Sequence, residues 1–199
     1  MAYEPDAPIT INADGTFELI AQPIGYKLTV DALPANGVSS YTVTRLKSPI
    51  GLGETNKIIA NATKNGSVTA TIYHLDELSF TAEKALGYHE PEAYPSGIVT
   101  FDADKNPNGI NAKVQAGARE KYTLTASKAN ATLAIKKQDG TVIQNGYSEL
   151  VYGDILYVSA NCDWTMYENL GLTINGVKQN IVTNVEVTVT GNVEVIASA

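Results

Sequence analysis

The chain has 199 residues, of which 44% are hydrophobic and 18% are charged, and its formal net charge at pH 7 is −7. This composition supplies enough apolar material for one large or two ordinary domains, and it excludes a disordered chain. Lysine and arginine residues form no cluster, so we expect no nucleic-acid binding, because neutralising phosphates needs clustered cations.

The N-terminus is acidic and lacks an apolar core, so it does not fit a signal peptide. No apolar run approaches the length of a membrane span, and we expect no membrane segment. Cys162 is the only cysteine, which excludes an internal disulfide. Residues 1–14 carry prolines and acidic residues, and we expect them to form an extended N-terminal arm.

Short segments with alternating apolar residues follow the arm, separated by glycine, proline and asparagine turn signals. The predicted strands of this first half cover residues 16–22, 26–32, 39–46, 57–62, 67–74, 97–103 and 110–114. Repeated short strands of this kind predict a β-sandwich. Residues 81–86 are also compatible with one or two helical turns, because Thr81 suits the start of a helix and Gly87 its end.

A shift in composition marks the boundary between two domains. All eight prolines lie within the first 107 residues, and a small, polar segment surrounds residue 117. We therefore divide the chain into the arm 1–14, a β-sandwich domain 15–116 that we expect to dock on a larger assembly, and a C-terminal domain 117–199. Residues 41–44 (Tyr-Thr-Val-Thr) and 122–125 (Tyr-Thr-Leu-Thr) hint that the two domains are similarly built.

The C-terminal domain also shows strand patterns throughout. Its predicted strands cover residues 121–127, 131–136, 141–143, 154–160, 172–175, 179–183, 185–189 and 193–197. In the last two, alternate residues are apolar, which places one set of side chains on one face. Gly191 and Asn192 stand between them, and a glycine in first place suits a type II′ turn. The pattern predicts a closing β-hairpin.

Four segments of this domain carry a resemblance: Ala131–Gly140, Val151–Ala160, Leu172–Gly176 and Val185–Ala197. Their turn sequences, in order, are Asp-Gly, Tyr-Gly-Asp, Asn-Gly and Thr-Gly-Asn. In this respect residues 121–199 resemble the divergent internalin-B-type β-repeat and related Ig-like modules of bacterial surface proteins and tailed-phage virion proteins. The resemblance implies that the domain 117–199 is an Ig-like β-repeat domain with a surface-exposed structural or binding role, and it brings no catalytic residues. The fold expected for the whole chain is all-β, with two small Ig-like β-sandwiches in tandem.

One segment has the side chains of a metal site. Residues 101–109 place oxygen-bearing side chains at alternate positions, namely Asp102, Asp104, Asn106 and Asn108. Calcium prefers such oxygen ligands. However, Pro107 and Lys113 stand where an EF-hand loop has its glycine and its final glutamate. The segment is therefore either a turn between strands or a calcium loop, and we expect no other cofactor.

Partner contact has candidates in two places. In the arm, Tyr3, Pro5 and Pro8 would add extended main chain to an exposed strand edge of a larger assembly. Further along, Tyr88 and Tyr94 are aromatic residues of the kind that anchors interfaces and stacks on sugars.

Aromatic residues also recur in the C-terminal domain: Trp164, Tyr167, Tyr147, Tyr152 and Tyr157. Two interpretations are open for this predicted cluster. The side chains pack in the core and rim of a small sheet, or they form a platform for glycans.

No serine, histidine and aspartate set has the strand–turn–helix setting typical of nucleophilic catalysis, so we expect no enzyme. A short, acidic, unsignalled β-protein favours a phage virion protein: a capsid decoration or head-fibre subunit, made in the host cytoplasm, that binds the major capsid protein. The alternative is an adhesin or glycan-binding module on the bacterial surface, with cell-surface glycans as its partners. Self-association into a homo-oligomer is compatible with both.

Overall fold

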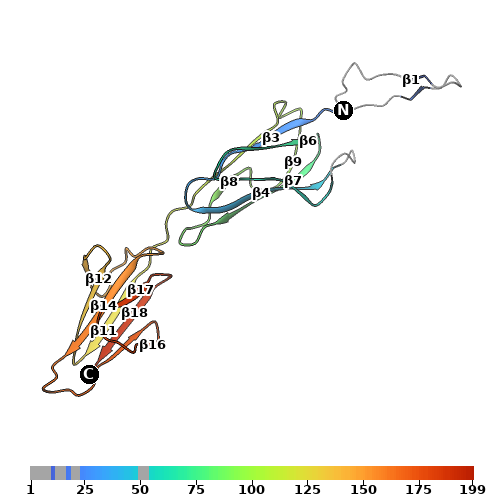
Figure 1. Cartoon of the computed structure of the whole chain (residues 1–199). Helices are drawn as coiled ribbons and strands as arrows, with labels where there is room; N and C mark the ends of the chain where they lie inside the picture. The colour runs from blue at the N-terminus through green and yellow to red at the C-terminus, as the bar shows by residue number, and fades with distance from the viewer. Residues whose placement is uncertain (1–9, 12–16, 19–22, 49–53) are drawn as a thin grey trace. The chain divides into compact units, whose positions relative to one another are not determined.

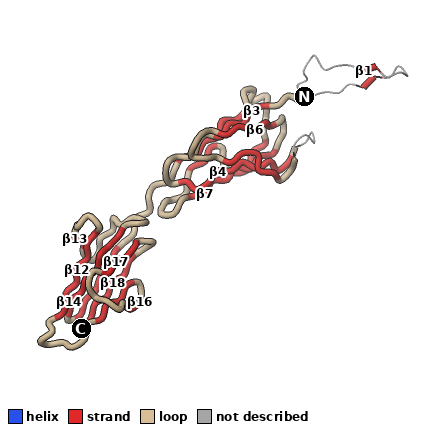
Figure 2. The backbone as a smooth tube through the Cα atoms, viewed as in Figure 1, coloured by secondary structure: helices blue, strands red, loops and turns tan. Residues whose placement is uncertain are grey.

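The computed structural model describes residues 10–11, 17–18, 23–48 and 54–199 (Figure 1). These residues form strands, turns and loops with no helix among them, which confirms the all-β prediction (Figure 2). In this part of the chain, accordingly, no helix is long and apolar enough to cross a membrane. β1 (Thr10–Ile11), in the predicted arm, pairs antiparallel with β2 (Phe17–Glu18), which belongs to the predicted strand 16–22. Tyr3, Pro5 and Pro8 of the arm, and residues 19–22 of that strand, lie outside the described residues.

The chain divides into two compact units. The first comprises Met1–Ala85 and Glu90–Gly117, and the second comprises Leu86–His89 and Ala118–Ala199. Each unit contains two four-stranded sheets with an apolar core between them, which confirms the prediction of two β-sandwiches.

One sheet of the first unit has the order β6 (Val68–Ile72), β3 (Tyr26–Val30), β10 (Ile110–Gln115), β8 (Glu92–Tyr94). The other has the order β5 (Lys57–Asn61), β4 (Val38–Lys47), β7 (Glu77–Lys84), β9 (Gly97–Thr100). The buried side chains between them include Leu28, Val30, Tyr41, Val43, Ile72, Leu78, Phe80 and Phe101. Aromatic residues thus supply much of the volume of this core.

The first unit also buries an ion pair. Arg45 and Asp76 are 6% and 0% exposed, and Arg45 Nε donates to Asp76 Oδ2 over 2.8 Å. The same carboxylate oxygen accepts from the backbone N–H of Tyr73, and Arg45 Nη2 donates to the carbonyl oxygen of Thr71. Because Arg45 belongs to β4 and Thr71 to β6, the pair joins the two sheets of the unit.

The helical alternative for residues 81–86 is wrong, because they lie at the end of β7 and just beyond it. Leu78 and Phe80 are buried while their neighbours are less so, which is the period of a strand. Antiparallel pairing with β4 then continues through Thr81 to Lys84. Tertiary pairing therefore overrides the local helix signals.

One sheet of the second unit has the order β11 (Leu124–Ala129), β18 (Val193–Ser198), β15 (Gly171–Ile174), β16 (Val177–Lys178). The other has the order β13 (Val142–Ile143), β12 (Ala131–Lys137), β14 (Ile155–Cys162), β17 (Val185–Thr188). The core between them is aliphatic, and its fully buried side chains include Leu124, Leu150, Leu156, Val158, Leu172 and Val195. The strand predicted at 179–183 is wrong, because the chain turns back at Asn175 and Gly176 and pairs at 177–178. Both turn residues have positive φ, as a type I′ hairpin turn requires.

The predicted closing hairpin is also wrong. The two strands are present as β17 and β18, but they belong to different sheets. Gly191 lies outside the left-handed region, so no type II′ turn forms there. Instead, the Asn192 carboxamide oxygen accepts from the N–H of Thr123, and Val193 N–H donates to the Thr123 carbonyl oxygen. These bonds attach the chain to the opposite sheet at the point where β18 begins.

Four residues that the sequence assigned to the first domain belong to the second unit. The N–H of His89 donates to the carbonyl oxygen of Ala118, and the N–H of Glu120 donates to that of Gly87. Gly87 has φ of 78°, and a β-carbon there would overlap the side chain of Tyr152. Only glycine fits this position, since it tolerates both the close approach and the positive φ.

Candidate functional site

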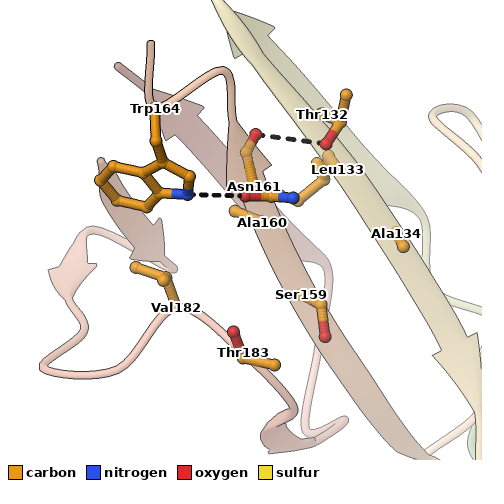
Figure 3. A pocket seen from close by; sticks show the side chains of 9 residues that line it. All are labelled: Thr132, Leu133, Ala134, Ser159, Ala160, Asn161, Trp164, Val182 and Thr183. Carbon is orange, nitrogen blue, oxygen red and sulfur yellow. Dashed lines mark hydrogen bonds between the residues drawn. The ribbon is translucent and has the colours of Figure 1, made fainter. Parts of the chain in front are cut away.

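A recess on the second unit combines the most exposed aromatic ring of that unit with small polar side chains. Its volume is about 400 Å³. The lining residues are Thr132, Leu133, Ala134, Ser159, Ala160, Asn161, Trp164, Val182 and Thr183 (Figure 3). We call this recess the Trp164 pocket. Its residues come from β12, from β14, from the turn after β14 and from the segment that precedes β17.

Strand register brings the polar residues together. Thr132 lies opposite Asn161, and Ala134 lies opposite Ser159. The Thr132 hydroxyl donates to the Asn161 carbonyl oxygen over 3.2 Å. The segment before β17 is held along β14 because the N–H of Ala160 donates to the Val182 carbonyl oxygen over 2.7 Å. Three stretches that are separate in sequence thus surround one recess.

A compact turn after β14 presents the indole ring. The backbone N–H and the hydroxyl of Thr165 both donate to Asp163 Oδ1, at 2.9 and 2.6 Å, so the Asp163 carboxylate closes its own turn. The hydrogen bond from the Thr165 hydroxyl, followed by that from its backbone N–H, lowers the pKa of Asp163. Trp164, at the second position of this turn, therefore projects from the end of the strand.

One hydrogen bond orients Trp164. Its Nε1–H donates to Asn161 Oδ1 over 3.1 Å, as Figure 3 shows. The same oxygen accepts from the Cys162 N–H, which fixes the carboxamide. The Trp164 side chain remains 59% exposed, so the ring is oriented without being covered. The Asn161 Nδ2 group and the Thr183 hydroxyl make no hydrogen bond with other described residues, so a ligand finds both a donor and an acceptor there.

The residues that line the pocket are all uncharged. The site therefore offers a flat apolar ring beside hydroxyl and carboxamide groups. This combination suits a neutral ligand that has both an apolar face and many hydroxyl groups.

The predicted calcium residues lie in the connection between β9 and β10. Asp102 Oδ1 accepts from the N–H of Asp104, and Asp102 Oδ2 pairs with the Lys105 ammonium over 3.1 Å. The Lys105 hydrogen bond, together with the backbone N–H groups of Asp104 and Lys105, holds the pKa of Asp102 below its usual value. The Asn106 side chain donates to the Asp102 carbonyl oxygen, and Asn108 is exposed.

In this turn, both Asp102 carboxylate oxygens have partners within the turn itself. Among the described residues, no group of three or more His, Cys, Asp or Glu side chains is placed to hold a metal ion. Calcium binding at residues 102–108 stays a prediction.

The two tyrosines proposed for partner contact are in different surroundings and in different units. Tyr88 is half-buried in the second unit, where its hydroxyl accepts from Arg119 Nε over 3.1 Å. The Arg119 guanidinium also lies over the Tyr88 ring, 5.6 Å from its centroid. Tyr94 belongs to the first unit and is 71% exposed. Partner contact by either residue stays a prediction.

The aromatic residues of the second unit are dispersed. Tyr147 packs against the apolar core, and Tyr152 covers Gly87. Trp164 is the one aromatic residue that lines the pocket. The sequence identified Trp164 as a glycan-platform candidate but missed its true neighbours, Thr132 and Thr183. Alternating polar residues on two adjacent predicted strands were the signal that could have indicated them.

Comparison with known proteins gives distant likenesses only. The chain matches no protein-family model and no curated protein. Among solved structures it is similar to the pilus adhesin SpaC of Lactobacillus rhamnosus GG, with 11% identity and a TM-score of 0.34, over 96% of this chain and 33% of that one. It therefore spans about a third of that adhesin.

Two further likenesses are to bacterial proteins of the same kind. The major pilin of Streptococcus pyogenes is 12% identical with a TM-score of 0.30, over 89% of this chain and 98% of the pilin. An adhesin of Mobiluncus mulieris is 11% identical with a TM-score of 0.26, over 86% and 87%. These neighbours are pilins and adhesins, and no phage protein is among the three. Likenesses at such TM-scores carry no weight for function, which has to be inferred from the Trp164 pocket.

Proposed function

We propose that this protein is a non-enzymatic binding module of a bacterial surface protein, and that its Trp164 pocket holds carbohydrate. One observation carries the proposal: an exposed indole ring is fixed at the edge of a recess with only uncharged lining residues. Sugars present C–H groups on their faces and hydroxyl groups around their edges. An aromatic ring next to hydroxyl and carboxamide groups matches both parts.

Two Ig-like sandwiches in tandem suit a spacer that exposes such a site on a cell surface, which supports the adhesin alternative. The virion interpretation depends on docking through Tyr3, Pro5 and Pro8, and these residues lie outside the described part of the chain. Because the exposed indole ring and the uncharged lining of the Trp164 pocket suit a sugar, we propose cell-surface glycans, rather than a capsid protein, as the partner.

The test is binding of the whole chain to an array of neutral and charged glycans, repeated with Trp164→Ala. We expect at least one neutral glycan to bind, and its affinity to fall about tenfold or more without the indole. Trp164 is the only tryptophan, so its fluorescence reports directly on occupancy of the pocket.

Ile98→Ala is the matched control, because it removes a similarly exposed large apolar side chain, 65% against 59% for Trp164, from the other unit. It should leave binding unchanged. Thermal melting should be nearly the same for all three proteins, since both side chains are mostly exposed. Absence of binding to any glycan, or full binding by Trp164→Ala, would overturn the proposal.

A further inference from the structure

The outer face that carries the Trp164 pocket continues along β14. Every second residue of this strand is buried, namely Leu156, Val158, Ala160 and Cys162. Tyr157, Ser159 and Asn161 therefore lie together on the outer face. Ser159 and Asn161 line the pocket, whereas Tyr157 is the next residue of the row. At a rise of ~3.3 Å per residue, Tyr157 lies ~13 Å along the strand from Asn161.

The surface between Trp164 and Tyr157 carries small side chains. Ser159 occupies it on β14, and the residue directly opposite on β12 is Ala134. Both side chains are small, and Ala134 is exposed. Two aromatic rings thus stand at the ends of a stretch of small, uncharged side chains.

Tyr157 has a cation on one side and an anion on the other. Lys136 of β12 lies directly opposite it, and so does Glu186 of β17. Both flanking side chains are exposed, and their charges balance. Tyr157 is partly exposed, and its hydroxyl makes no hydrogen bond with another described residue. This row therefore offers a ring face, hydrogen-bond donors and acceptors, and no net charge.

We infer that the site takes a linear, neutral oligosaccharide that lies along β14, with one sugar ring on Trp164 and a later ring on Tyr157. This inference rests on the proposed carbohydrate binding at the Trp164 pocket. A single sugar or a disaccharide occupies only the pocket. A longer oligosaccharide passes over the small side chains of Ala134 and Ser159 and also stacks on the Tyr157 ring. A chain with net charge is attracted by one of the flanking side chains and repelled by the other, so a neutral chain fits best.

The experiment measures affinity against chain length. Disaccharide to hexasaccharide ladders of β-1,4-glucan, α-1,4-glucan and N-acetylglucosamine, together with any neutral linkage found on the array, are titrated while the fluorescence of Trp164 is followed. We expect affinity to rise with length and then to level off once Tyr157 is covered. In Tyr157→Ala, hexasaccharide affinity should fall about tenfold while disaccharide affinity changes less than about twofold.

Three variants keep the test decisive if Tyr157→Ala is poorly folded. Tyr157→Phe retains the ring and should retain most of the length dependence. Lys136→Ala removes an exposed neighbour of Tyr157 and should weaken only the long chains, by roughly threefold. Thr125→Ala, at an exposed position on β11 in the other sheet of the unit, is the matched control and should change nothing.

The possible failures are distinguishable. If disaccharide and hexasaccharide bind equally well, or if Tyr157→Ala and Lys136→Ala weaken both to the same degree, the extended site is wrong and the pocket stands. If binding requires a charged sugar, the neutral-chain inference is wrong. If no glycan changes the Trp164 emission at any length, the proposed function itself fails.

Discussion

The two units share one strand connectivity but differ in what holds them together. In chain order, β3, β4, β5, β7, β8, β9 and β10 of the first unit correspond to β11, β12, β13, β14, β15, β17 and β18 of the second. Each pair of neighbouring strands in the first unit has the same relative direction, parallel or antiparallel, as the corresponding pair in the second. The parallel pairs are β3–β10 and β11–β18. The first unit adds β6 at one edge, and the second adds β16.

The interiors of the two units differ. The buried polar or charged residues among those described, Arg45, Ser48 and Asp76, all belong to the first unit. The second unit has an aliphatic core. The same topology is thus compatible with a core that contains a buried ion pair and with one that does not, which shows that connectivity does not decide the source of stability.

The equivalent connections also differ. The connection between β7 and β8 contains Leu86–His89, which belongs to the second unit. Its counterpart between β14 and β15 carries Trp164. Both connections end beside the last strand of their unit, because Glu92 pairs with Gln115 and Gly171 pairs with Ser198. The same connection of the fold therefore contributes four residues to the neighbouring unit in one case and carries the candidate binding residue Trp164 in the other.

The largest expected effect comes from the ion pair of the first unit. Arg45→Ala leaves Asp76 buried without its charged partner, and we expect it to lower the unfolding free energy of this unit by about 3–5 kcal/mol. Circular dichroism should show an early transition, whereas Trp164 fluorescence, which reports on the second unit, should melt nearly as in the wild type. An equal shift of both signals would contradict a separate source of stability for each unit.

The converse change is Leu156→Ala in the second unit. Leu156 is fully buried, so truncation removes apolar contacts and leaves a cavity, at a cost of about 2–5 kcal/mol. Here the Trp164 fluorescence transition should move to lower temperature, and the transition of the first unit should remain. Val142→Ala, which truncates an exposed aliphatic residue in the same unit, should have almost no effect on either transition.

The smallest effect concerns Tyr41, a buried residue of the first unit whose hydroxyl donates to the carbonyl oxygen of Pro95. Burial raises the pKa of Tyr41 to about 12, above its ordinary value of 10.0. Stability from the protonated phenol is therefore fully present below pH 10 and is lost as pH rises towards 12.

The measurement is urea unfolding of the wild type and of Tyr41→Phe across this pH range. At neutral pH the unfolding free energy of the variant should be about 1 kcal/mol lower than that of the wild type, because the hydrogen bond to Pro95 is lost. Between pH 10 and 12 this free energy should fall less steeply in the variant than in the wild type. Parallel pH profiles for the two proteins would show that Tyr41 does not contribute to the loss.

Alternation along single strands made much of the fold predictable. Segments such as Tyr26–Val30 and Val193–Ser198 alternate buried and exposed residues, and their strand character follows from this period. Which strands pair is not a local property. The alternation at 185–189 and 193–197 is real, yet the two strands face the core from opposite sheets, because Asn192 and Val193 bond to Thr123.

The similarity between the domains was anticipated from the wrong residues. The Tyr-Thr sequences at 41–44 and 122–125 do not occupy equivalent positions, since the first lies in β4 and the second leads into β11. The true correspondence is in connectivity and leaves no shared sequence motif at these positions. In the same way, Trp164 was visible as a candidate, but its neighbours Thr132 and Thr183 become adjacent only through sheet register.

The parallel pairing of the first and last strands has a mechanical consequence. In the second unit, β11 and β18 pair residue by residue from Leu124 with Val193 to Ala129 with Ser198. Because the strands run in the same direction, the chain enters this pair at one end and leaves it at the other. Tension applied at both ends of the unit acts along the strands and loads their hydrogen bonds in shear. Hydrogen bonds loaded in shear share the force and have to break together, whereas bonds loaded perpendicular to the strands, in an unzipping geometry, break one at a time.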